Sequence, residues 1–194
     1  MGGETMNLSF VSALLLDPDA STASVVSRML RAFGLHDQKI VESGAEAKAA
    51  LENKLYDIVI SEATLADMPA VDLIRWLRRL ESNPVRLIPV VVLTGYSQQS
   101  LVELARDAGA NLVVKKPVPT RAFYDRLNWL TKGGRLFVEC PAYVGPDRRF
   151  KNAGLPGGVG RRVTDVSGDL GEPTAPNMSQ DEIDALIKPM KVSL

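Results

Sequence analysis

The sequence predicts an α/β fold in which helices cover both faces of a doubly wound, five-stranded parallel sheet. Short apolar runs alternate with stretches of helical periodicity from Ser9 to Leu130. The runs are apolar almost without interruption, which is typical of parallel strands buried on both faces. Strands and helices that alternate in this way form right-handed β–α–β units, and these build an open sheet with helices on either side.

The individual elements follow from these runs and from the spacing of apolar residues between them. The predicted strands are Ser12–Leu16, Lys39–Val41, Asp57–Ser61, Leu87–Leu93 and Asn111–Val114. The predicted helices cover residues 21–33, 45–53, 69–81, 98–108 and 119–131. In the fourth helix the apolar residues recur at the i, i+3, i+4, i+7 spacing of a buried helical face. We therefore expect an N-terminal tail at 1–8 and one folded domain at 9–131.

Composition excludes several classes of protein. The chain has 194 residues, of which 45% are hydrophobic and 24% charged, as in globular proteins. Its 23 basic and 23 acidic residues balance, so we expect no DNA partner. A single cysteine, Cys140, excludes an internal disulfide framework and a multi-cysteine zinc site. No apolar run reaches the roughly 18 residues of a membrane span, and Leu8–Leu16 lacks the basic segment of a signal peptide, so we expect a cytoplasmic protein without a membrane partner.

The chain changes in character beyond the domain. Residues 132–140 form a short extension, and residues 141–177 contain seven Gly and five Pro, which predicts a flexible linker. The linker carries two arginine pairs that could bind an anion, because guanidinium groups bind phosphate bidentately. These pairs are Arg148 with Arg149 and Arg161 with Arg162. Solvation of the pairs, or pairing with the acidic half of the same tail, is the competing interpretation.

Polar side chains follow four of the predicted strands. Because the carboxyl ends of parallel strands meet at one edge of a sheet, we expect these side chains to share a crevice. They are Asp17 and Asp19 after the first strand, Glu62 after the third, Thr94 after the fourth and Lys116 after the fifth.

This constellation, with Pro117 directly after Lys116, resembles the receiver domain of bacterial two-component response regulators. The resemblance extends over residues 9–131 and implies a flavodoxin-like sheet in the order 2-1-3-4-5, with a cis peptide bond before Pro117. In that family two acids after the first strand hold Mg²⁺ and an Asp after the third strand accepts phosphate. Asp17, Thr94 and Lys116 match the family's first acid, hydroxyl and lysine.

Two positions depart from the family's pattern. Pro18 stands where the second acid is expected, although Asp19 is adjacent, and Glu62 stands where the phosphoaccepting Asp is expected. The extra methylene of Glu moves its carboxylate by about 1.5 Å, and a misplacement of about 1 Å costs on the order of a hundredfold in rate. Because Mg²⁺ requires near-octahedral oxygen geometry, we expect no cofactor, or at most a weak Mg²⁺ site at Asp17 and Glu62. The sequence predicts a degenerate phosphoacceptor site in which Glu62 lies near Lys116, as a permanent negative charge or as a plain salt bridge.

We therefore expect an atypical response regulator that is not an enzyme and acts by protein–protein interaction, without Asp phosphorylation, in chemotaxis or motility signalling. Two alternatives stay open. The first is a genuine phosphoacceptor that uses Glu62 or Asp19. The second is a nucleotide-binding signalling protein that uses the arginine pairs of the linker.

The C-terminal residues 178–189 predict a short amphipathic helix. Ser179 and Glu182 have the spacing of a capping box, and Pro189 ends the pattern. The residues expected to contact a partner are Met178, Glu182, Ile183, Leu186 and Ile187. A helix of this length is marginal alone in water, which favours a segment that folds against a surface.

The same segment is similar to the receiver-binding N-terminal peptide of the flagellar motor switch protein and, more loosely, to the C-terminal peptide of the chemotaxis phosphatase. This resemblance implies docking on the face formed by the fourth helix, fifth strand and fifth helix of a receiver domain. We expect docking in cis on the chain's own domain, with capture in trans by a chemotaxis-type receiver. A sensor kinase is the other partner considered, and a helix that simply caps its own domain is the competing interpretation.

Overall fold

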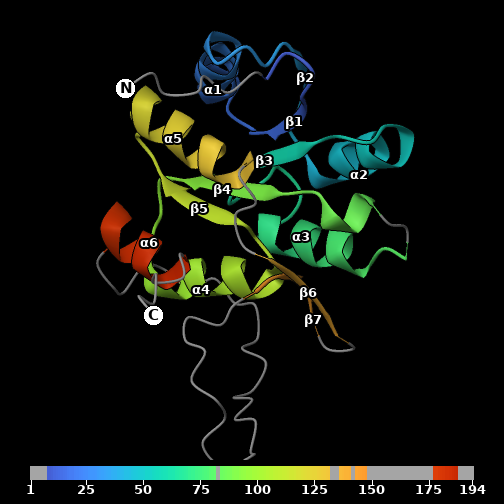
Figure 1. The fold of residues 1–194 in the computed structure, drawn as a ribbon, viewed down its shortest axis with the longest axis vertical. Helices are drawn as coiled ribbons and strands as arrows, with labels where there is room; N and C mark the ends of the chain where they lie inside the picture. The colour runs from blue at the N-terminus through green and yellow to red at the C-terminus, as the bar shows by residue number, and fades with distance from the viewer. Residues whose placement is uncertain (1–7, 82–83, 132–135, 141–142, 148–176, 188–194) are drawn as a thin grey trace, which may run out of the picture.

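The main sheet has five parallel strands in the order β2-β1-β3-β4-β5 in the computed structural model (Figure 1), which confirms the predicted fold class and strand order. The structure describes residues 8–81, 84–131, 136–140, 143–147 and 177–187. The strands are β1 (Ser12–Leu16), β2 (Asp37–Val41), β3 (Ile58–Glu62), β4 (Val90–Thr94) and β5 (Leu112–Lys115). Every residue of β1 and β4 is buried, because helices cover both faces of the central strands.

Two layers of helices enclose the sheet (Figure 1). The helices are α1 (Ala20–Ala32), α2 (Gly44–Asn53), α3 (Ala70–Arg79), α4 (Gln99–Ala108) and α5 (Thr120–Thr131). The end of α1 and helix α5 share one face, where the Phe33 ring makes edge contacts with the rings of Phe123 and Tyr124. Helices α2, α3 and α4 pack side by side on the other face.

The first predicted strand has the observed bounds, and those of the other four differ from the observed ones by one to three residues. The fourth strand was predicted from Leu87, but a 3₁₀ turn, η1 (Val85–Leu87), occupies its beginning and β4 starts at Val90. The apolar run Leu87–Leu93 continues from this turn into the strand, so periodicity does not show where the strand begins. The second strand begins two residues earlier than predicted, because β2 is an edge strand that tolerates exposed polar residues.

A second sheet has two strands, one from the predicted extension and one from the start of the predicted linker. Strands β6 (Phe137–Cys140) and β7 (Tyr143–Pro146) pair antiparallel, so the predicted linker from residue 141 is wrong at its start. Side-chain contacts to the main domain hold this hairpin: the Arg78 guanidinium lies 4.9 Å from the centroid of the Phe137 ring. Gly109, at φ +106, lets β7 approach closely, because a Cβ there would lie 3.2 Å from the Val144 carbonyl oxygen.

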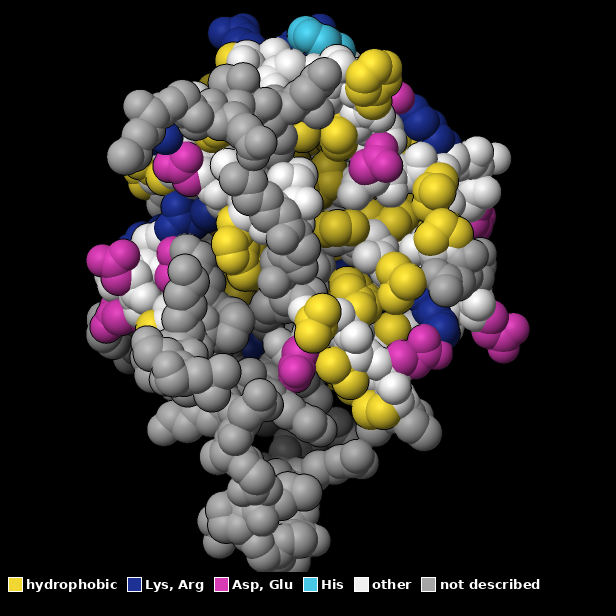
Figure 2. All heavy atoms as spheres, viewed as in Figure 1, with side chains coloured by type: hydrophobic (Ala, Val, Ile, Leu, Met, Phe, Trp, Pro, Cys, Tyr) yellow, Lys and Arg dark blue, Asp and Glu magenta, His cyan; other side chains and the backbone are white. Residues whose placement is uncertain are grey.

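The hairpin contributes to an exposed apolar surface. Figure 2 shows hydrophobic side chains gathered over the hairpin and the neighbouring helices on the face in view. Leu136, immediately before β6, is 81% exposed. An ion pair of 2.5 Å between Arg86 and Glu139 lies at the same hairpin.

The tail returns to the domain as helix α6 (Gln180–Ile187), which lies beside α4 and along β5 (Figure 1). The helix begins two residues later than predicted, because Met178 and Ser179 precede its first turn. Residues 188 and 189, and with them Pro189 as the end of the helix, lie outside the described residues. So do the arginine pairs Arg148/Arg149 and Arg161/Arg162. Among the helices that the structure describes, none is long and apolar enough to cross a membrane.

Candidate functional site: a closed carboxylate–lysine cluster and a docked helix

Lys116 joins the two carboxylates at the carboxyl end of the sheet. Its ammonium nitrogen Nζ lies 2.8 Å from Asp17 Oδ2 and 2.5 Å from Glu62 Oε2. The remaining carboxylate oxygens also accept hydrogen bonds: Asp17 Oδ1 from the Asp19 N–H at 2.9 Å and Glu62 Oε1 from the Ala63 N–H at 2.7 Å. The cluster is therefore closed, since each carboxylate already bonds the ammonium and one backbone amide.

The sheet register brings these three residues together. Leu16 pairs with Ser61 across β1 and β3, so the residues that follow, Asp17 and Glu62, end neighbouring strands. Lys116 follows β5 directly, and a cis peptide bond joins it to Pro117, as the resemblance implied. The predicted proximity of Glu62 and Lys116 is confirmed.

Burial and hydrogen bonding act in opposite directions on Lys116. Partial burial lowers the pKa of the ammonium, but the hydrogen bonds that it donates to Asp17 and Glu62, together with their negative charges, outweigh this effect. The pKa of Lys116 is therefore raised above its ordinary value of 10.5. The ammonium is a fixed positive charge at neutral pH.

Asp19 faces helix α1 rather than the cluster. Its Oδ1 accepts hydrogen bonds from the N–H groups of Ser21 at 2.8 Å and Thr22 at 3.1 Å, which makes it the N-cap of α1. These two bonds lower the pKa of the Asp19 carboxyl. In the sequence, Asp19 stands beside Pro18, where the family's second metal-binding acid is expected. In the structure, the Asp19 carboxylate caps helix α1 instead.

Thr94 ends β4 without reaching the cluster through a hydrogen bond. Its hydroxyl donates to the Tyr96 carbonyl oxygen at 3.1 Å and accepts from the Tyr96 N–H at 3.0 Å. The hydroxyl thus closes the turn that leads to Ser97. The sequence correctly placed Thr94 at the edge of the sheet that carries the cluster, but its bonds are local.

A sequence model of the response regulator receiver domain matches residues 13–128. The chain belongs to this family. Two curated relatives show how far the sequences within the family have diverged. Transcriptional regulatory protein ZraR of Salmonella typhimurium is 27% identical over 117 residues, which are 60% of this chain and 24% of that protein. Sensory/regulatory protein RpfC of Xanthomonas campestris pv. campestris is 27% identical over 114 residues, 59% of this chain and 16% of that protein. This receiver chain therefore spans about a quarter or less of the length of these relatives.

Solved receiver structures share the fold. A CheY-like receiver domain protein from Methanospirillum hungatei superimposes with a TM-score of 0.58 at 20% identity, covering 64% of this chain and 95% of that one. The receiver domain of a sensor histidine kinase from Pseudomonas aeruginosa, solved with a magnesium ion in its active site cleft, gives a TM-score of 0.56 at 24% identity. That match covers 63% of this chain and 98% of the other.

The residues of this receiver domain do not fit the magnesium ion that the solved relative holds. Pro18 supplies no carboxylate, Asp19 caps α1, and Asp17 and Glu62 are both engaged by Lys116. Within the part of the chain that the structure describes, no group of three or more His, Cys, Asp or Glu side chains could hold a metal ion. A cation would have to displace the Lys116 ammonium to reach both carboxylates, so the weak Mg²⁺ site at Asp17 and Glu62 is disfavoured.

Helix α6 occupies the α4–β5–α5 face of this receiver domain. Ile183 and Ile187 are 0% and 1% exposed, whereas Met178 and Leu186 are only partly buried. Glu182 lies at the exposed start of the helix, where it completes the predicted capping box: its Oε2 accepts from the Ser179 N–H at 2.7 Å.

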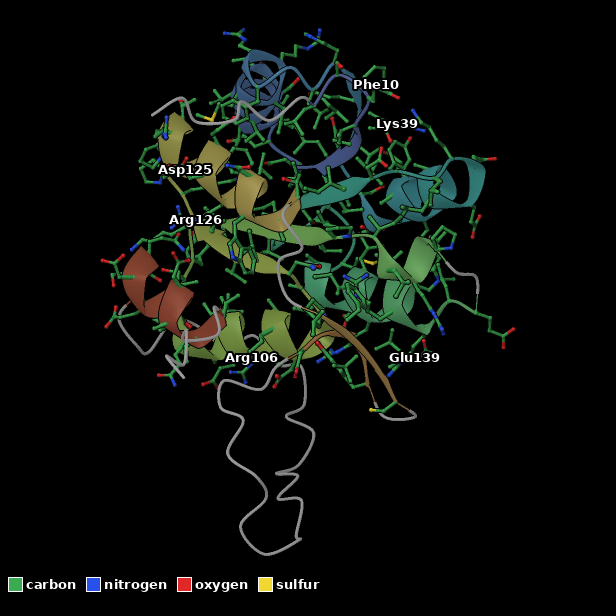
Figure 3. All side chains as sticks on the ribbon, viewed as in Figure 1. Phe10, Lys39, Arg106, Asp125, Arg126 and Glu139 are labelled. Carbon is green, nitrogen blue, oxygen red and sulfur yellow. The ribbon has the colours of Figure 1, made fainter. Side chains whose placement is uncertain are left out.

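One ion pair and hydrogen bonds to backbone groups add to this apolar contact. Arg126 projects from α5 on the side of the domain that α6 covers (Figure 3). Its Nη2 donates a hydrogen bond to Asp184 Oδ2 at 2.9 Å. The Met178 N–H donates to the Ser97 carbonyl oxygen at 2.8 Å, and the Ser97 hydroxyl donates to the Met178 carbonyl oxygen at 2.8 Å. Met178 thereby fixes the position of Ser97 in the loop that follows β4.

Sequence reasoning missed three residues that hold these elements in place. Ser97 and Gln180 bind α6 to the domain, and Arg78 joins α3 to the start of β5 and to the hairpin. The signal for Arg78 was available: it stands beside Leu77 on the apolar side of a helix, where a charged residue needs buried partners. Ser97 and Gln180 carried no such signal, because the bonds by which their side chains join α6 to the domain go to backbone groups far along the chain.

Proposed function

We propose that this receiver domain protein signals by protein–protein contact and not by phosphorylation of an aspartate. It acts as a binding module, not as an enzyme, and needs no Mg²⁺. The observation that carries this proposal is the position of Lys116 between Asp17 and Glu62. The ammonium occupies the place between the carboxylates, and the longer side chain of Glu62 replaces the acid that family members phosphorylate.

Helix α6 is the contact element in this proposal. It packs in cis on the α4–β5–α5 face, where two of its isoleucines are fully buried. It is a short helix that follows the receiver domain in the sequence. We infer that the partner is a chemotaxis-type receiver domain, which captures α6 in competition with this chain's own face. Contacts in trans are weak, because ordering the segment costs about 2–5 kcal/mol and association costs more.

Phosphorylation is tested with acetyl phosphate and Mg²⁺. The intact mass of the chain is expected to stay unchanged, as is that of Glu62→Asp, because Pro18 and the capping role of Asp19 leave the metal ligands incomplete. The double variant Pro18→Asp with Glu62→Asp restores both acids and serves as the positive control, which is expected to gain one phosphoryl group. A stable phosphoryl group on Glu62 of the unmodified chain would contradict the proposal.

A further inference from the structure

The outer edge of strand β6 points away from the domain. The Asp147 N–H donates to the Leu136 carbonyl oxygen at 2.7 Å, so hydrogen-bonded pairs alternate with non-hydrogen-bonded pairs along the hairpin from this point. Val144 belongs to a non-hydrogen-bonded pair, and its carbonyl oxygen lies beside Gly109 of the domain. The outer edge of β7 therefore faces the domain, and that of β6 faces away. Among the strands that the structure describes, β6 pairs with β7 alone.

Apolar side chains of β6 face outward. Side chains alternate between the two faces of a strand, and Phe137 and Glu139 face the domain, where each contacts an arginine side chain. The outward set is Leu136, Val138 and Cys140, of which Leu136 is 81% exposed. A hairpin covered only by water is expected to carry polar residues on this face. An apolar outward face indicates a surface that packs against another chain.

The sequence of β6 also lacks the features that keep edge strands from pairing. Exposed edge strands usually carry Lys, Pro or a bulge. Residues 136–140 read Leu-Phe-Val-Glu-Cys, and their register with β7 is regular. The one charge among them, on Glu139, is paired with Arg86 at 2.5 Å. An identical strand can therefore approach this edge without net repulsion between like charges.

We propose that β6 pairs antiparallel with β6 of a second copy of this chain, which joins two hairpins into one four-stranded sheet. A two-fold axis relates the two strands, so the contact closes as a dimer. The outward backbone groups of β6 belong to Phe137 and Glu139, because their pairs with β7 are non-hydrogen-bonded. Pairing centred on Val138 bonds Phe137 of each copy to Glu139 of the other. It also separates the two Glu139 carboxylates, which a register centred on Glu139 would place opposite each other.

The outward apolar faces of the two hairpins become continuous in this register. Val138 lies opposite Val138 of the other copy, and Leu136 lies opposite Cys140. Two apolar patches of about 300–600 Å² bury about 600–1,200 Å² in total, the low end for a specific contact. The dimer is therefore weak and forms in a concentration-dependent way. Neither Lys116 nor α6 takes part, so the inference does not depend on the proposed function.

Sedimentation velocity of the full chain tests the dimer. The chain is expected to shift from monomer toward dimer as its concentration rises. Val138→Lys places two ammonium groups opposite each other at the two-fold axis and is expected to weaken the dimer at least about tenfold. Val25→Lys makes the same change at a 51% exposed position of α1, so it is the matched control and keeps the dimer. A chain that stays monomeric, or equal dissociation constants for the two variants, overturns the proposal.

Disulfide trapping tests the register and does not require that Val138→Lys folds. Val138→Cys with Cys140→Ser puts the two cysteines of a dimer opposite each other, at a Cβ separation of about 4.5 Å, close to that of a disulfide. Oxidation is expected to cross-link this variant. Cross-linking is expected neither in the unmodified chain, where Cys140 lies opposite Leu136, nor in Val25→Cys with Cys140→Ser. No cross-linking of the Val138→Cys variant, or equal cross-linking of the Val25→Cys control, overturns the pairing.

Discussion

Arg126 of α5 and Asp184 of α6 form an ion pair of 2.9 Å across 58 residues of sequence, and their side chains are only 13% and 17% exposed. Removing one partner leaves the other poorly solvated and without its opposite charge. Asp184→Ala is therefore expected to weaken docking of α6 by roughly 1.5–3 kcal/mol. Faster exchange of the Met178 amide, which bonds Ser97, reports this loss. Asp181→Ala, at an exposed position, should leave the rate unchanged, and equal effects of both variants would contradict the prediction.

Two apolar positions of α6 are expected to respond differently to an added charge. Ile183 is completely buried, whereas Leu186 is partly exposed. Full burial of such a side chain is worth about 1.5–3 kcal/mol, so Ile183→Asp should release the helix. Leu186→Asp should release it less. Amide spectra of residues 98–131 and binding to a chemotaxis-type receiver measure both; unchanged spectra and binding for Ile183→Asp would show that α6 is not a ligand.

Lys116 is expected to stabilise the fold by separating two carboxylates. In Lys116→Met, Asp17 and Glu62 face each other without a cation at a site where both are mostly buried. We expect a loss of about 3–5 kcal/mol in the free energy of unfolding at neutral pH, measured by urea denaturation. The double variant Lys116→Met with Glu62→Gln removes one of the opposing charges and should recover part of the loss. No recovery would indicate that the methionine itself disturbs packing.

Alkaline pH should weaken the unmodified chain through the same residue. The pKa of Lys116 is raised in the folded state, so the folded state holds this proton more tightly than the unfolded state does. The resulting stabilisation is complete below the ordinary pKa of 10.5 and is lost as pH rises through the folded-state pKa. Urea midpoints of the unmodified chain and of Lys116→Met should therefore converge above about pH 10.5. A constant difference up to the most alkaline pH would contradict this assignment.

Arg78 is expected to be essential for folding. Burial lowers the pKa of its guanidinium to about 10, yet the group stays charged at neutral pH and donates to four acceptors. These are the carbonyl oxygens of Gly109, Arg86 and Ile88 and the side-chain oxygen of Asn111. Arg78→Ala should lower the free energy of unfolding by several kcal/mol, about 1–3 for each acceptor left buried and unpaired. Arg78→Lys should rescue little, because a single ammonium cannot reach the same fork of acceptors; full rescue would show that charge alone suffices.

The sheet could be predicted because its signals are local. Nearly unbroken apolar runs such as Ser12–Leu16 have only one stable environment, between two layers of helices, and the sequence places one helical stretch after each run. The cluster could be predicted for the same reason, since Asp17, Glu62 and Lys116 all follow strands whose ends meet. The capping box of Ser179 and Glu182 spans only four residues and is likewise visible in sequence.

The role of Asp19, the β6–β7 hairpin and the contacts of Gln180 with β5 became clear only from the tertiary structure. The sequence offered Asp19 either a metal site or a helix start, and in the structure its carboxylate accepts the backbone N–H groups of Ser21 and Thr22 at the start of α1. The hairpin of β6 and β7 escaped prediction because its Gly and Pro residues are typical of linkers, and contacts with Arg78 and Gly109 hold it in place. The bonds of Gln180 to the domain could not be predicted, since they go to outer backbone groups of β5. These groups form a bonding edge only once the sheet is assembled.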